Sequence, residues 1–367
     1  MKKIGLQEAL EGIEDTRRDR SVLYPLSEIL IVMLLAIMCG ATSYAKIEMF
    51  GKGKETWLRR FLKLENGIPD ACTTRNVIRQ IDTEQLHKIF ADWMKSIAQI
   101  LFGVVAIDGK EARCTRDRNK RPLHVVSAFS HSCGLVLGQI VCEEKSNEIT
   151  AIPKLLELLE IKGCIVTIDA MGCQKEIAEK ITNAGADYCF GLKGNQSSLH
   201  DDVKLYFEHM EAAVPNQTVT IEKGHGRIET RAYFLETNID WLAQRPLWEG
   251  LNAIGMVKSK VLEKDICSED TRYFITSLND VKAFANAIRS HWCIENNLHW
   301  CLDIAFREDK SRARKDNSAE NLNVFRQMAF NILKAEPSLA GSFSDKQFKC
   351  LLDERYLENV ISHWIRS

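Results

Sequence analysis

The clearest pattern of apolar and polar positions surrounds Glu295. At about 100° per residue, four apolar side chains fall on one helical face: Phe284, Ile288, Leu298 and Leu302. Glu295 lies in the middle of that face, so the pattern predicts a carboxylate at a buried position. Burying an unpaired carboxylate costs several kcal/mol, so a cation, a proton or a metal ion is expected as its partner. An ordinary ion pair with Arg289 or a histidine is the alternative.

Helical spacing extends over the first part of the chain and predicts an all-helical N-terminal domain over residues 1–98. Its most apolar stretch, Leu26 to Ala41, contains an uninterrupted apolar run of only 11 residues. A bilayer span needs about 20, so this run indicates a buried core helix. Shorter helices are expected over 44–50, 56–64, 74–81 and 84–97.

After Gly103 the pattern changes to the short apolar runs of buried strands. Val104 to Ile107 precedes Asp108, and Cys164 to Ile168 precedes Asp169, so both strands are expected to end in an aspartate. The remaining spacing predicts an α/β order, with a hairpin over 123–142, helices over 147–160 and 174–184, and a strand over 188–192. Carboxylates at the carboxyl ends of neighbouring parallel strands converge where α/β folds place their sites.

The α/β order breaks at about residue 196. A helix over 199–210 and four β segments follow, which we interpret as a mostly β insertion around 196–280. The helix that carries Glu295, another helix over 321–334 and an amphipathic tail over 346–365 complete a second domain, predicted to cover 99–367.

Composition limits the partners. The 49 basic and 50 acidic residues give a net charge of −1, so nucleic-acid binding has to come from local basic segments. The 12 cysteines are scattered without a C-x-x-C pair. This indicates the reducing cytoplasm and argues against a disulfide framework or a structural zinc site.

Asp108, Asp169 and Glu295 are far apart along the chain, so any relation between them is spatial. Three carboxylates meeting at strand ends and a helix suit Mg²⁺ or Mn²⁺. A pair of such ions can activate the attacking oxygen and stabilise the leaving oxygen in phosphoryl transfer. Taken singly, Asp108 is also a common turn former and Asp169 a common helix cap, so both alternatives stay open.

Five ordered motifs closely resemble the bacterial H-repeat-associated transposases, which belong to the DDE insertion-sequence transposases. They are Ala106 to Lys110, Ile165 to Gln174, Leu192 to Gln196, Gly224 to Glu229 and His291 to Asp303. The resemblance runs over nearly the whole chain, including the helical N-terminal region.

This resemblance implies a ribonuclease-H-like catalytic core with a mostly β insertion. It assigns the catalytic and metal-binding roles to Asp108, Asp169 and Glu295, with two Mg²⁺ or Mn²⁺ ions. The implied reaction is hydrolysis at element ends followed by attack of the freed 3′-hydroxyl on target DNA. The implied partners are double-stranded DNA and a second copy of the chain, in a synaptic dimer.

One departure from the family pattern concerns Glu295. Related transposases have a tyrosine, an arginine and a lysine where this chain has Ile288, His291 and Leu302. Arg289 or Lys310 is the candidate replacement for the missing cations, and three further acids are rival third carboxylates: Asp303, Glu308 and Asp309. Two other functions therefore remain open, a catalytically silent DNA-binding remnant and a nuclease without strand transfer.

Basic side chains near the three acids are the expected DNA contacts, because phosphates have to pass there. They are Lys110, Arg113, Arg116, Lys193, His225, Arg227, Arg289, His291, Arg312 and Arg314. A solvated surface is the alternative for each basic segment. Trp292 and Trp300 are expected to pack in the core rather than to stack on bases.

Overall fold

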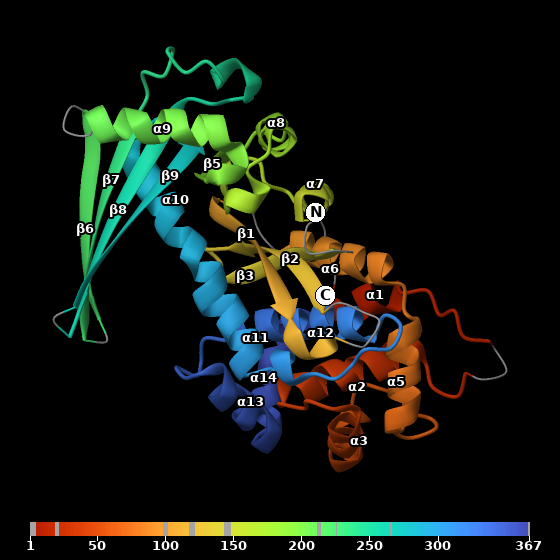
Figure 1. The fold of residues 1–367 in the computed structure, drawn as a ribbon. Coiled ribbons are helices and arrows are strands. Elements are labelled where there is room, and N and C mark those ends of the chain that lie inside the picture. The colour runs from red at the N-terminus through yellow and green to blue at the C-terminus, as the bar shows by residue number, and fades with distance from the viewer. Residues whose placement is uncertain are drawn as a thin grey trace.

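The computed structural model describes residues 5–18, 22–97, 102–116, 122–142, 148–210, 214–224, 226–264 and 266–365. These residues form a sheet with helices on both faces (Figure 1). One face packs against α7 (Glu148–Glu157), α8 (Lys175–Asn183) and α9 (Ser197–Met210). The mixed α/β architecture expected from the apolar periodicity is confirmed.

The sheet has nine strands in the order β3-β2-β1-β4-β5-β9-β8-β7-β6. Parallel pairing joins β1 (Gly103–Ala112) to β4 (Cys164–Ile168) and β4 to β5 (Asp187–Leu192). The hairpin of β2 (Leu123–Ser130) and β3 (Leu135–Cys142) is antiparallel to β1. These five strands bring the segments that contain the two aspartates next to each other.

The first strand does not end at Asp108, as expected, but continues to Ala112. Its pairing with β4 stops at Ile107, whereas its pairing with β2 continues through Ala112. The expectation was wrong because β2 satisfies the backbone of β1 beyond the point where β4 ends. Asp108 thus lies inside a strand, just past the last residue that pairs with β4.

The β-rich segment forms two hairpins: β6 (Asn216–Gly224) with β7 (Arg227–Glu236), and β8 (Ala253–Glu263) with β9 (Ile266–Thr276). Antiparallel pairing of β9 with β5 joins them to the central sheet. Their far ends project away from the rest of the molecule in Figure 1. The segment therefore extends the existing sheet.

The described residues up to 97 form the helices α1 (Leu6–Glu11), α2 (Leu26–Met38), α3 (Tyr44–Gly53), α4 (Glu55–Leu58), α5 (Ala71–Gln80) and α6 (Thr83–Ile97). The helix expected over 56–64 ends early at Leu58, and Leu64 has a positive φ of 48°. No helix among the described residues is long and apolar enough to cross a membrane.

These N-terminal helices share one hydrophobic core with the end of the chain. That core includes side chains of α2 and α6 together with α12 (Ser318–Lys334), α13 (Phe343–Leu352) and α14 (Glu354–Ile365). It also reaches Phe129 and Val136 on the sheet. The domain boundary at residue 98 stays a prediction.

The helix that carries Glu295 has three parts: α10 (Val281–Cys293), a π-helical turn (Ile294–His299) and α11 (Trp300–Ile304). The Phe284 ring anchors α10 on β8, where a side chain at Gly255 would collide with it. Gly255 therefore permits the close approach that holds this helix on the sheet.

Candidate active site

Asp108 faces its neighbour Ser127 across the β1–β2 ladder, and its side chain is 17% exposed. Burial raises the pKa of this carboxyl to about 8, and the nearby charges of Asp169 and Glu295 add to the effect. The Nδ1 atom of His299 lies 3.6 Å from Asp108 Oδ2. Asp108 is thus electrostatically coupled to the other two predicted acids.

Asp169 directly follows β4 and caps the short helical turn after it. Its Oδ1 atom accepts hydrogen bonds from the backbone N–H groups of Met171 (3.0 Å) and Gly172 (3.4 Å). The capping role considered for this residue is therefore real. Burial raises the pKa of Asp169, and the negative charge of Glu148 adds to this. A cap and a ligand role are compatible, because the second carboxylate oxygen makes no hydrogen bond to a described residue.

Glu295 is exposed, so the expectation that it lies on the buried face was wrong. The four apolar residues of that face are buried as expected: Phe284, Ile288, Leu298 and Leu302. The π-helical turn between them changes the rotation per residue and carries Glu295 out of the stripe. Its side chain lines a cavity of about 470 Å³ that Asp169 and Lys193 also line.

A fourth carboxylate, Glu148 at the start of α7, also belongs to this region and was not predicted. Its charge raises the pKa values of both Asp108 and Asp169. Glu148 Oε1 lies 2.5 Å from Nε2 of the buried His124. A side chain at Gly109 would collide with the Glu148 carboxylate. Two features of the sequence could have indicated Glu148. Gly109 lies inside a strand, where a glycine often marks a close approach of another group, and Glu148 is an acid in the first turn of a helix.

As they stand, no three His, Cys, Asp or Glu side chains of the described residues are arranged as a metal site. The donor set nevertheless fits a hard divalent cation. Carboxylate oxygens are the ligands that Mg²⁺ and Mn²⁺ prefer, and the charges of Asp169 and Glu295 both act unfavourably on an ionised Asp108. A cation among them would neutralise that repulsion.

The two histidines on either side of Glu295 are held neutral. His291 Nδ1 lies 3.0 Å from Thr167 Oγ1, and burial lowers the pKa of His291 to about 4. Burial and then the charge of Lys110 lower the pKa of His299 to about 3. His291 therefore does not supply the positive charge that an arginine supplies at this position in related transposases.

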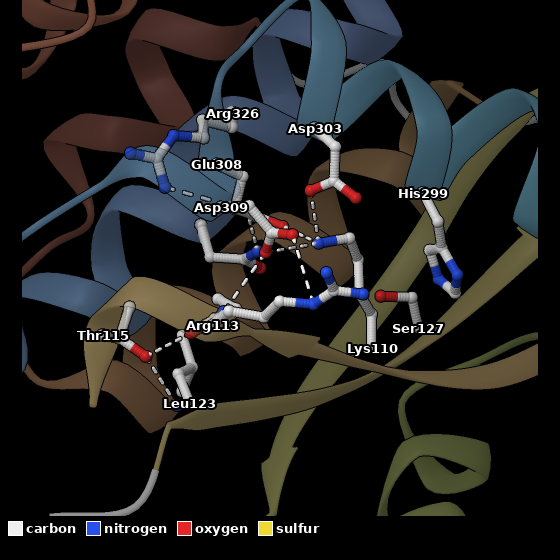
Figure 2. Close-up of polar contacts among 12 residues, drawn as sticks. Lys110, Arg113, Thr115, Leu123, Ser127, His299, Asp303, Glu308, Asp309 and Arg326 are labelled. Carbon is white, nitrogen blue, oxygen red and sulfur yellow. Dashed lines mark hydrogen bonds and ion pairs between the residues drawn. The ribbon is translucent and has the colours of Figure 1, made fainter.

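Lys110, two residues after Asp108, lies in a cluster of acids rather than on an open surface (Figure 2). Its side chain is 11% exposed, and its Nζ atom is 2.7 Å from Asp303 Oδ1, 3.1 Å from Glu308 Oε2 and 3.7 Å from Asp309 Oδ1. Burial lowers the pKa of Lys110, but the charges of Glu308 and Asp303 outweigh this effect, so the pKa is raised overall. All three rival acids thus lie within ion-pair distance of Lys110, and Asp309 and Glu308 also lie near Arg113 and Arg326.

The other predicted DNA contacts divide into two groups. Several already have partners within the chain. Arg289 donates two hydrogen bonds to Glu222, at 2.7 and 2.6 Å, and Arg314 donates to the Cys114 carbonyl at 3.0 Å. Arg227 lies 3.8 Å from Glu229, and Arg113 lies 3.6 Å from Asp309. Others are exposed and make no ion pair with a described residue: Arg116, Lys193 and Arg312. His225 lies outside the described residues.

The two tryptophans of this helix differ. Trp292 is partly buried and lies under Arg272, whose guanidinium is 4.8 Å from the ring centroid. Trp300 is 58% exposed, so the expectation that it packs in the core was wrong. Trp300 precedes the buried Leu302 by two residues, and at about 100° per residue this spacing puts its side chain on the opposite side of the helix.

Comparison with known proteins agrees with the resemblance found in the motifs. The family model described as the transposase DDE domain matches residues 101–332, and a model described as DDE_Tnp_1-associated matches residues 7–94. The chain is 39% identical over 371 residues to the putative transposase YncI of Escherichia coli O157:H7, covering 97% of this chain and 94% of that protein.

The H repeat-associated putative transposase YhhI of Escherichia coli strain K12 is 38% identical over 371 residues, covering 97% of each protein. Among solved structures, a cryo-EM structure of the piggyBac transposase synaptic complex with hairpin DNA aligns with a TM-score of 0.42 and 9% identity. That alignment covers 96% of this chain and 76% of that one. The matched domain and the full-length relatives show that this chain belongs to the DDE transposase family, and that it is similar to the H-repeat-associated transposases.

Proposed function

We propose that this chain cleaves DNA at the ends of its insertion sequence and joins the freed 3′-hydroxyl to target DNA. The observation that carries the proposal is that Asp108 and Asp169 directly follow the last paired residues of neighbouring parallel strands, while Glu295 lines the same cavity as Asp169. The strand order β3-β2-β1-β4-β5 supports a ribonuclease-H-like core. We expect the enzyme to work in the cytoplasm.

The proposed roles follow from position. Asp108, held in β1, and Asp169, held as a helix cap, would be the fixed ligands of Mg²⁺ or Mn²⁺. Glu295 would complete the set from the exposed side of the cavity. When bound, two such ions activate the attacking oxygen and stabilise the leaving oxygen. Lys193, exposed on the same cavity as Asp169, would hold a phosphate of the cleaved strand.

The proposed DNA partners are the two element ends and the target. Because two ends have to be processed together, we propose a homodimer in the synaptic complex. A silent DNA-binding remnant is the second candidate function. The neutral His291, at a position where related enzymes have an arginine, favours it.

The test is cleavage of a labelled DNA fragment that contains the flanks of the gene, with Mn²⁺ or Mg²⁺. Asp108→Asn, Asp169→Asn and Glu295→Gln should each abolish cleavage while retaining DNA binding. Asp303→Asn, the matched control among the rival acids, should still cleave. Binding without cleavage by the unmodified protein would support the remnant, and cleavage without joined products would support a simple nuclease.

A further inference from the structure

A second cavity lies away from the three acids. Its volume is about 410 Å³, within the range of about 300–1,000 Å³ for pockets that hold small molecules. Its walls come from α2, α3 and α5 on one side and from residues 311–315 and α12 on the other. It therefore lies between the N-terminal helices and the segment that follows the acid cluster of Lys110.

Positive charge dominates the lining. Six cationic side chains line the cavity and no acidic one does among the described residues: Arg75, Arg79, Arg312, Arg314, Lys315 and Arg326. Within the described part of the chain, two of them pair with an acid: Arg79 with Asp316 at 3.6 Å and Arg326 with Glu308 at 3.7 Å. Arginine clusters of this kind are suited to phosphate, which they bind through paired N–H groups.

The rest of the lining combines apolar side chains with Tyr44 and four hydroxyl residues: Thr42, Ser43, Ser311 and Ser318. Ile37, Ile47 and Leu322 contribute aliphatic walls. The Tyr44 hydroxyl oxygen is buried near Ser318 without a hydrogen bond of ordinary geometry to a described residue. The Arg75 guanidinium lies 5.9 Å from the Tyr44 ring centroid. A bare phosphate would leave these walls and this hydroxyl unused, whereas a nucleotide offers both a planar base and a phosphate.

We propose that this cavity binds one unpaired nucleotide, with its phosphate on the arginines and its base against the apolar wall and Tyr44. That the nucleotide belongs to DNA rests on the proposed function. Arg314 supports the link to the cleaved strand, because it donates to the carbonyl of Cys114, shortly after β1 ends. A nucleotide held here would lie near the short turn Arg113–Thr115, which follows β1.

The experiment compares two labelled duplexes, one blunt and one with a single unpaired nucleotide at its 3′ end, in EDTA so that no cleavage occurs. The unmodified protein should bind the second duplex about tenfold more tightly, the effect of stacking one base. Equal binding of the two duplexes would overturn the proposal. Free deoxyadenosine monophosphate serves as a competitor. If it binds while the duplexes show no preference, the cavity is a site for free nucleotides and the assignment to DNA is wrong.

Two kinds of variant separate charge from shape. Arg75→Gln and Arg312→Gln, both at exposed residues, should reduce the preference and lower the salt dependence of binding by about one phosphate contact. Ala313→Leu, which fills part of the cavity without changing its charge, should remove the preference. Arg355→Gln is the matched control, since Arg355 is exposed on α14 and does not line the cavity. A full preference in Ala313→Leu would contradict the proposal.

Failure of this inference and failure of the proposed function give different results. Asp108→Asn should keep the preference for the unpaired nucleotide, because binding here needs no catalysis. A preference without any cleavage by the unmodified protein would contradict the proposed function alone. Cleavage without a preference would contradict the nucleotide site alone.

Discussion

The Nζ atom of Lys110 lies 2.7 Å from the Oδ1 atom of Asp303. Residues 108 and 110 are two apart on β1, so their side chains leave the same face of the sheet. Asp303 lies on α11, which directly continues the helical element of Glu295. The ion pair of Lys110 therefore links the segment after Glu295 to the strand that carries Asp108. In this structure the charge of Lys110 stabilises the fold and is not free to contact DNA.

Replacing Lys110 tests that role. Lys110→Met should lower the free energy of unfolding by about 3–5 kcal/mol, because it leaves Glu308, which is only 1% exposed, without its nearest cation. Urea unfolding followed by circular dichroism measures this. Arg116→Gln, at an exposed residue, should change stability by less than about 0.5 kcal/mol. If Lys110→Met instead kept its stability and bound DNA more weakly, the result would support the prediction that Lys110 contacts DNA.

Gly109 and Glu148 are expected to be coupled. A methyl group at residue 109 would collide with the Glu148 carboxylate and lie 2.7 Å from His124 Nε2, so Gly109→Ala should destabilise the fold by about 1–3 kcal/mol. Glu148→Ala makes room for that methyl group. The double variant should therefore lose less stability than the sum of the two single losses, as a double-mutant cycle by urea unfolding would show. Simple additivity would mean that the two residues do not meet.

Divalent cations should stabilise the chain through Asp108. The carboxylates of Asp169 and Glu295 act on a buried Asp108, and a cation bound among them relieves the repulsion. At about 100 times its Kd, Mn²⁺ should add about 2.7 kcal/mol to the free energy of unfolding, which a thermal melt detects as a higher Tm. Asp303→Asn should show the same rise in Tm. An equal rise in Asp108→Asn would place the bound ion elsewhere.

The stability of the fold in acid should depend on His87, a residue of α6 that is 4% exposed. Its Nε2 atom lies 3.3 Å from Nε2 of Gln139 on β3. Burial lowers its pKa from 6.5 to about 4 in the folded state. Between pH 6.5 and about pH 4, His87 is therefore protonated in the unfolded chain but not in the folded chain. The free energy of unfolding falls as the pH is lowered through this range. The steepest loss for one group is about 1.4 kcal/mol per pH unit. In His87→Gln, the difference in urea unfolding free energy between pH 7 and pH 5 should be smaller, and an equal difference would exclude this cause.

Much of the fold could be predicted because it depends on local apolar spacing. The apolar run after residue 26 is a helix buried along its length, and the runs before Asp108 and Asp169 are neighbouring parallel strands. Pairing of those strands brings their acids together whatever the remainder of the chain does. The location of the two aspartates thus followed from sequence patterns and from the general geometry of parallel strands.

Other features depended on contacts that no local pattern records. Glu295 reaches the cavity because a π-helical turn interrupts the period of about 100° per residue from which its burial was inferred. Lys110 has the composition of a DNA contact, but its three acidic partners come from a segment almost 200 residues away. Glu148 approaches Asp108 only because α7 packs next to a glycine in β1. The sequence alone determined which segments form strands and helices, since that depends on neighbouring residues. The tertiary structure decided which charges meet, since electrostatic partners are chosen by distance in space.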